Sequence, residues 1–206
     1  MPSISHFDIY KPAEPCNLTG EQLRETMDRI VVECLSKDGK ELNLKGYCVG
    51  SQGMSVITMD DRIAQVKRLN LGGNRIGDEG VQLLAEASLF SKVNWLELGG
   101  NDIGSRGIKA LVNSKVLGKV KTLNLYRNFL KDEGAVILAG ENKLLKIEEM
   151  DLAQNEIADK GLLALAYSKA FPNLVAAYFD NNYASAEASE EARQAPNFKK
   201  LQSLNL

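Results

Sequence analysis

The sequence predicts an α/β solenoid, a right-handed arc or horseshoe with a parallel β-sheet on its concave face and α-helices on its convex face. Three observations support this architecture. Apolar pairs recur at 27-residue steps along most of the chain, and each pair alternates with polar residues as a strand does. A segment with helical apolar spacing follows each pair. A unit of this kind cannot bury its apolar side alone, so neighbouring units must stack.

The strand part of the unit is clearest over residues 66–76 and 93–103. In the first of these copies, Leu69 and Leu71 point to one side of a short strand, toward the core. Asn74 follows and closes the strand, and its amide is expected to bond the backbone of the turn in a ladder along the solenoid. The strand positions repeat at Leu42, Leu69, Leu96, Leu123, Met150, Ala177 and Leu204, and the asparagine repeats at Asn101, Asn128, Asn155 and Asn182.

The helical part of the unit carries its own pattern. A polar residue stands where a helix N-cap is expected, at Asp78, Ser105, Asp132 and Asp159. Two residues later a glycine recurs, which indicates close packing, at Gly53, Gly80, Gly107, Gly134 and Gly161. Leucines then face inward from the helices, at Leu84, Leu111, Leu138 and Leu165.

This pattern, L-x-x-L-x-L-x-x-N-x-L, resembles the leucine-rich repeat, and the helical segments at 76–86 and 130–139 resemble its ribonuclease-inhibitor-like subclass. The resemblance covers residues 39–206. It implies a non-catalytic module that binds a protein partner on its concave face. This implication rests on the fold and names no target.

Three regions are expected along the chain. Residues 1–18 hold three prolines and no period, which predicts an extended N-terminal arm. Residues 19–36 predict a capping helix that opens with a capping box, Thr19 with Gln22. Residues 37–206 form the repeat domain of about six repeats plus a final strand over 199–206. The first repeat is atypical, because Tyr47 stands in place of the asparagine.

Composition excludes several classes of protein. The net charge of −2, from 25 basic and 27 acidic residues, gives no field for binding nucleic acid or an acidic membrane. The three cysteines are widely spaced and include no Cys-x-x-Cys, which argues against a disulfide framework or zinc site and favours a reducing compartment. A single histidine, His6, excludes sites built on several histidines. We therefore expect no catalytic residue, cofactor or metal, and a cytoplasmic location.

The candidate site is the concave face. Side chains between the core leucines point outward there, and Trp, Tyr and Arg are the residues that most often anchor interfaces. The alternative for Trp95 is that it only packs over neighbouring side chains. The candidate partner-binding residues are Arg68, Asn70, Trp95, Glu97, Thr122, Asn124, Tyr126, Arg127, Glu149, Asp151 and Tyr178.

Three functions remain open at this point. The first is the protein-binding module, either a scaffold or, by the same resemblance, an effector that bacteria deliver into the host cytosol. The second, which the same resemblance implies, is a regulator of an enzyme such as a nuclease or small GTPase. The acidic residues Glu97, Glu149 and Asp151 are compatible with a basic target. The third is a structural homo-oligomer, formed through the C-terminal edge strand with its apolar Leu204 and Leu206.

Overall fold

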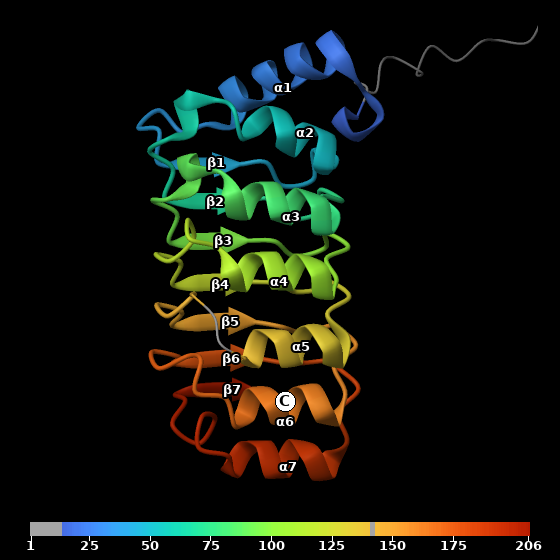
Figure 1. Ribbon diagram of the computed structural model, residues 1–206, viewed down its shortest axis with the longest axis vertical. Coiled ribbons are helices and arrows are strands. Elements are labelled where there is room, and N and C mark those ends of the chain that lie inside the picture. Colours follow the sequence, from blue (N-terminus) through green and yellow to red (C-terminus); the bar gives the residue numbers. More distant parts are fainter. Residues whose placement is uncertain (1–13, 141–142) are drawn as a thin grey trace, which may run out of the picture.

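The computed structural model describes residues 14–140 and 143–206, and it is an open α/β solenoid (Figure 1). Seven short parallel strands form one sheet in chain order, with the helices stacked in a second layer beside it. The strands are β1 (Glu41–Asn43), β2 (Arg68–Asn70), β3 (Trp95–Glu97), β4 (Thr122–Asn124), β5 (Glu149–Asp151), β6 (Ala176–Tyr178) and β7 (Ser203–Asn205). The helices are α1 (Gly20–Cys34), α2 (Gly50–Ile57), α3 (Gly77–Glu86), α4 (Ser105–Asn113), α5 (Lys131–Ala139), α6 (Asp159–Ala166) and α7 (Ala186–Gln194).

The strand register confirms the repeat. Leu42 pairs with Leu69, and Leu69 pairs with Leu96, so each residue lies beside its counterpart 27 positions away. The same register continues to β7. The middle residue of each strand from β1 to β6 is buried between the sheet and the helices. The inward leucines of the helices are buried opposite them, at Leu84, Leu111, Leu138 and Leu165.

The predicted asparagine ladder is present. The Nδ2 of Asn74 donates to the carbonyls of Leu44 and Leu71, both at 2.8 Å, and so joins two repeats. Its backbone N–H donates to Oδ1 of Asn101 at 3.0 Å. The pattern recurs along the array, with one interruption: Asn155 Oδ1 is the one buried side-chain polar atom of the described residues without a hydrogen-bond partner. The ladder is therefore weakest between the repeats of β4 and β5.

The helices begin in two different ways. The helices α1, α2, α3 and α5 start at a residue with positive φ: Gly20 (57°), Gly50 (63°), Gly77 (60°) and Lys131 (54°). The helices α4, α6 and α7 follow an extended residue, which is Gly104, Ala158 or Ser185. Glycine adopts the left-handed conformation without a steric penalty, whereas Lys131 adopts it at a steric cost because it carries a Cβ.

The N-cap prediction for the repeats was wrong. Asp78, Ser105, Asp132 and Asp159 lie inside the first turn of their helices, and none of these helices has a side-chain N-cap bond. Three of the four reach forward one repeat instead. Asp78 Oδ1 accepts from Gly104 and Gly107, Asp132 Oδ1 accepts from Ala158 and Gly161, and Asp159 Oδ1 accepts from Ser185. The stacking of the repeats creates this cap.

The N-terminal segment is tied to the first repeat. α1 packs its buried side chains, Leu23, Met27, Ile30 and Val31, onto the core. Arg62, in a short 3-10 helix (Asp61–Ile63), pairs with Asp28 of α1 at 2.7 Å. Thr19 lies at the N-cap of α1, yet its side chain makes no capping bond, so the capping box was a wrong prediction.

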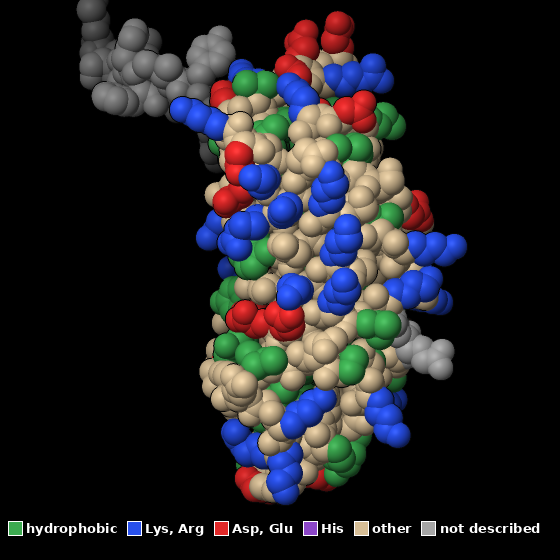
Figure 2. All heavy atoms as spheres, turned by 90° about the vertical axis from the view of Figure 1, so that its left-hand side faces the viewer, with side chains coloured by type: hydrophobic (Ala, Val, Ile, Leu, Met, Phe, Trp, Pro, Cys, Tyr) green, Lys and Arg blue, Asp and Glu red, His purple; other side chains and the backbone are tan. Residues whose placement is uncertain are grey.

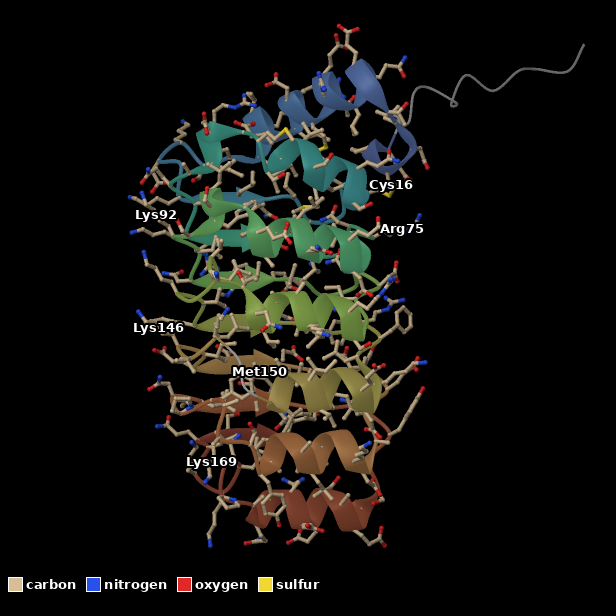
Figure 3. All side chains as sticks on the ribbon, in the orientation of Figure 1. Cys16, Arg75, Lys92, Lys146, Met150 and Lys169 are labelled. Carbon is tan, nitrogen blue, oxygen red and sulfur yellow. A yellow bond between two sulfur atoms is a disulfide. The ribbon has the colours of Figure 1, made fainter. Side chains whose placement is uncertain are left out.

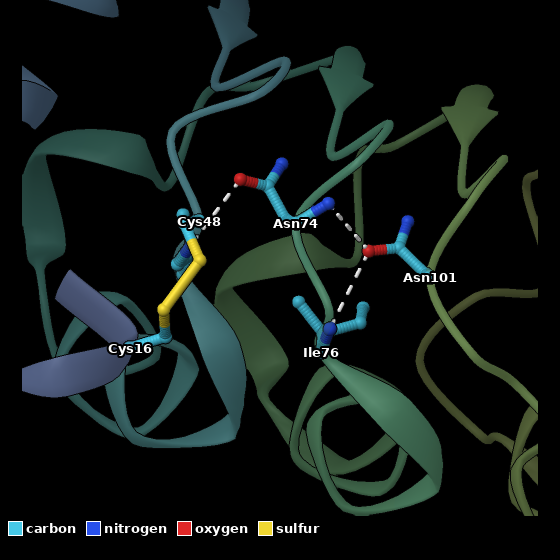
Figure 4. Close-up of a disulfide and its surroundings, with 6 residues drawn as sticks. Cys16, Cys48, Asn74, Ile76 and Asn101 are labelled. Carbon is cyan, nitrogen blue, oxygen red and sulfur yellow. Dashed lines mark hydrogen bonds between the residues drawn. A yellow bond between two sulfur atoms is a disulfide. The ribbon is translucent and has the colours of Figure 1, made fainter. Parts of the chain in front are cut away.

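A disulfide corrects the expectation for the cysteines. Cys16 and Cys48 are bonded across 32 residues of sequence (Figure 4). In addition, Cys16 N–H donates to the carbonyl of Cys48 at 2.8 Å. Cys16 belongs to a short 3-10 helix (Pro15–Asn17) that packs beside α2, so the fold places the two sulfurs together. The wide spacing hid this pairing. The cysteines therefore no longer argue for a reducing compartment.

The rest of the predicted arm, residues 1–13 with His6, lies outside the described residues. Within residues 14–140 and 143–206, none of the helices combines the length and the apolarity that crossing a bilayer requires.

Candidate protein-binding surface

The outward side chains of the sheet form two parallel rows. Because each strand residue pairs with its counterpart, a row advances by about 4.8 Å from one strand to the next. The first row runs through Glu41, Arg68, Trp95, Thr122, Glu149, Ala176 and Ser203. The second row runs through Asn43, Asn70, Glu97, Asn124, Asp151, Tyr178 and Asn205. The sequence-predicted strand residues all lie in these rows.

The first row is centred on a cation–π pair. The guanidinium carbon of Arg68 lies 4.3 Å from the centre of the Trp95 ring. On the other side of Arg68, its Nε lies 3.9 Å from Oε2 of Glu41. Trp95 is half-buried and points away from the core, as its phase relative to Leu96 predicts. Arg68 therefore lies between Trp95 and Glu41 and is close to both.

The second row has a structural role that the sequence analysis missed. From β1 to β5, the polar side chain of this row accepts a hydrogen bond from the N–H two residues later, which closes the turn after its strand. Asn70 bonds Gly72 (3.0 Å), Glu97 bonds Gly99 (2.6 Å), Asn124 bonds Tyr126 (2.7 Å) and Asp151 bonds Ala153 (3.0 Å). The signal for this role was a polar acceptor at one repeat position, which is typical of Asx-turns.

The acidic residues of the second row repel each other. Burial raises the pKa of Glu97, and the charge of Asp151 raises it further. Burial also raises the pKa of Asp151, together with the charge of Asp180. Asn124 lies between the two carboxylates, and its Nδ2 is 3.5 Å from Asp151 Oδ2. A cationic group placed here would relieve this repulsion.

The remaining predicted residues flank the rows. Tyr126 follows β4 and is 38% exposed, Arg127 beside it is exposed, and Tyr178 on β6 is half-buried. Glu149 on β5 is also exposed. The one cluster of potential metal ligands among the described residues is elsewhere, at Glu14, Cys16 and Cys48, and its sulfurs are joined in the disulfide.

Comparison with known proteins agrees with the repeat. A family model described as "Leucine Rich repeat" matches residues 66–85, 93–112 and 143–166, which are strand–helix units of the solenoid. The chain is a leucine-rich repeat protein. Its fold is similar to an internalin from Listeria monocytogenes, with a TM-score of 0.50 and 20% identity. That similarity covers 80% of this leucine-rich repeat chain and 47% of the internalin chain, so this protein spans about half of the internalin structure.

A second solved structure, described as leiomodin-1 actin-binding site 2, is less similar to this leucine-rich repeat protein. Its TM-score is 0.36 at 14% identity, over 88% of this chain and 76% of that one. No curated protein sequence gives a significant match.

Proposed function

We propose that this leucine-rich repeat protein is a non-catalytic module that captures a protein partner on its concave face. Leucine-rich repeat proteins commonly mediate protein–protein interaction. The observation that carries the proposal is the Arg68–Trp95 pair on the outward side of the sheet, in which Arg68 is exposed and Trp95 is half-buried. Arg and Trp are the residues most enriched at energetic centres of interfaces.

The size of the surface supports the same function. Seven strands at about 4.8 Å make a sheet about 29 Å wide. A standard interface takes about 800 Å² from each partner, which a small protein or an extended peptide would cover on the two rows. Within this proposal, a helix of eight to ten residues after each strand from β1 to β6 supports the ribonuclease-inhibitor-like subclass.

The test is affinity capture from a lysate with the wild type and a Trp95→Ala variant. A matched control is Tyr183→Ala, because Tyr183 is a more exposed aromatic outside the two rows. Loss of an anchoring Trp costs about 2 kcal/mol or more, so Trp95→Ala should lose the partner while Tyr183→Ala retains it. Equal retention by both folded variants removes Trp95 from the binding surface.

The regulator of an enzyme is a second candidate, favoured by one observation. Glu97 and Asp151 in the second row, with Asp180 after β6, concentrate negative charge there. Burial and then a neighbouring carboxylate raise the pKa of both Glu97 and Asp151, and Lys45 offsets only part of this for Glu97. A basic target such as a nuclease would supply a further cation. Its association should weaken steeply between low and physiological salt, whereas capture centred on Trp95 should be nearly insensitive to salt.

A homo-oligomer through β7 and the cellular location remain proposals with their own tests. Leu204 and Leu206 lie at the last strand of the sheet and are only partly buried. Sedimentation over a range of concentrations should show a dimer if that edge pairs with a second copy.

Trapping of thiols in intact cells separates a cytoplasmic or host-cytosol protein, with Cys16 and Cys48 reduced, from one in an oxidising compartment.

A further inference from the structure

A basic groove runs along the edge of the sheet where the strands begin. This edge is the left-hand side of Figure 1 and faces the viewer in Figure 2, where blue side chains predominate over its middle. The groove measures about 500 Å³ and is lined by two side-chain amides, Gln65 and Asn94, and five lysines. The five lysines are Lys67, Lys92, Lys119, Lys121 and Lys146.

The repeat aligns these lysines. Lys92, Lys119 and Lys146 occupy one repeat position, so they stack at about 4.8 Å per repeat. Lys67 and Lys121 share another position, two residues closer to the strand. Figure 3 shows Lys92 and Lys146 projecting from the same side of the molecule. A net charge of −2 therefore hides a line of positive charge along one edge.

The charge of this line is largely uncompensated. Lys121 pairs with Glu148 at 2.7 Å, and Lys92 donates to Gln65 at 2.5 Å. Of the carboxylates in residues 14–140 and 143–206, none forms an ion pair with Lys67, Lys92, Lys119 or Lys146. Like charges held this close repel each other, and an anionic ligand would remove that repulsion.

We propose that this basic groove binds an extended acidic segment of a protein partner. Alternate side chains of an extended peptide repeat at about 6.6–6.8 Å, and flexible lysine stems can follow that spacing. The side-chain amides of Gln65 and Asn94 line the groove and can hydrogen-bond the backbone of such a peptide. The groove is separate from the two concave rows, so the inference does not depend on the proposed function.

Two other anionic partners fit less well. Single-stranded nucleic acid is bound by aromatic side chains that stack on bases, and none lines this groove. Basic residues alone suffice for an anionic membrane, whereas this groove also holds two side-chain amides, Gln65 and Asn94, that suit a peptide backbone. Both partners are outcomes of the test below.

The test measures fluorescence anisotropy of a labelled ten-residue peptide of alternating Glu and Leu, with the full chain at low salt. The variant is Lys92→Gln/Lys119→Gln/Lys146→Gln, which removes three charges from the groove. The matched control is Lys109→Gln/Lys160→Gln/Arg193→Gln, which removes three charges from the helices α4, α6 and α7. A peptide with Gln in place of Glu, a single-stranded oligonucleotide, and vesicles with and without anionic lipid complete the set.

We expect the groove variant to lose the acidic peptide at least tenfold in affinity and the control variant less than twofold. The Gln peptide should not bind, and added salt should weaken the acidic peptide. Equal losses in the two variants would overturn the proposal, because the overall field and not the groove would then bind. Tighter groove-dependent binding of the oligonucleotide or the anionic vesicles would overturn it in favour of that partner. Trp95→Ala should bind the peptide as the wild type does, which separates this result from the concave-face proposal.

Discussion

Asp78 at the start of α3 caps the helix of the following repeat at Gly107. Its Oδ1 accepts from the N–H of Gly107 at 2.9 Å and from that of Gly104 at 2.7 Å. A Cβ on Gly107 would lie 2.6 Å from this same oxygen. At this position the aspartate that caps the helix leaves room only for glycine, and Asp132 with Gly161 repeats the arrangement.

Gly107→Ala should therefore be costly. The new methyl group displaces the capping carboxylate, which combines overpacking with a lost cap, about 2–4 kcal/mol in total. Gly134→Ala is the matched control, because its Cβ would meet no carboxylate: its nearest neighbours are the side chains of Leu130, at 3.1 Å, and Ile108, at 3.6 Å, and alanine favours the helix. Its free energy of unfolding should change by about 1 kcal/mol or less. Urea unfolding of both variants provides the measurement, and similar losses would argue against the inter-repeat cap.

Lys131→Gly should stabilise the protein. Lys131 begins α5 with φ 54°, where a side chain costs about 1–2 kcal/mol, and glycine at the same position in α3 has no such cost. The greater freedom of glycine in the unfolded chain offsets part of the gain, which leaves about 0.5–1 kcal/mol. Lys131→Ala is the control, because it removes the contact of Lys131 with Glu156 at 3.7 Å and keeps the strain. If alanine stabilises as much as glycine, the backbone is not the cause.

The Cys16–Cys48 disulfide should hold the N-terminal segment on the first repeat. In the unfolded state it closes a loop across 32 residues, which corresponds to about 3–4 kcal/mol of stabilisation. Cys16→Ser should lower the free energy of unfolding by that amount, and Cys34→Ser, at the free cysteine, should change it much less. Alkylation in denaturant without reductant should modify one cysteine of the three. Modification of all three in protein kept from reductants would contradict the pairing.

Glu97→Gln should stabilise the protein at neutral pH. The folded state raises the pKa of Glu97, so the stability associated with its neutral form is present below the unfolded value of about 4.3 and is lost as pH rises through the folded pKa. Gln keeps an oxygen that accepts from Gly99. The variant should match the wild type near pH 4 and exceed it at pH 7 in thermal unfolding. Glu25→Gln, on the exposed side of α1, should show no such divergence.

Leu98→Ala tests the core of a central repeat. Leu98 is fully buried, so the lost contacts and the remaining cavity should cost about 2–5 kcal/mol. Leu204→Ala should cost less, because Leu204 lies in the last strand and is only partly buried. Denaturant unfolding with Lys109→Ala as an exposed reference compares them. Equal tolerance at all three positions would contradict the assigned core.

The strand register was predictable because the step from one repeat to the next, such as that from Leu69 to Leu96, is constant along the chain. With a constant step, only one stacking places every residue beside its counterpart. Contacts between repeats were less visible in the sequence. Asp78 looked like the cap of its own helix, since its partner Gly107 is 29 residues away and becomes a neighbour only after stacking. Cys16 and Cys48 escaped notice for the same reason.

The candidate surface was predictable in its outline and not in its chemistry. Alternation placed Trp95 and Glu97 outward, and the structure has both there. It could not show that Glu97 accepts a hydrogen bond from the N–H of Gly99 in the turn, or that the ring of Trp95 makes a cation–π contact with Arg68. The lysine edge was hidden because a net charge averages over all faces.

From α3 to α6 the two kinds of helix start alternate, and this alternation decides how that part of the array can change its length. The left-handed start of α3 at Gly77 recurs 54 residues later, at Lys131 of α5. The helix between them, α4, follows Gly104 and depends on the cap from Asp78. If the α4 repeat alone were duplicated, the helix of the new copy would have no aspartate to cap its start. If the α3 repeat alone were duplicated, one aspartate would have no helix start to cap. If the α3 and α4 repeats are gained or lost together, every helix start keeps the residues that it needs. The unit of growth for this part of the chain is therefore two repeats.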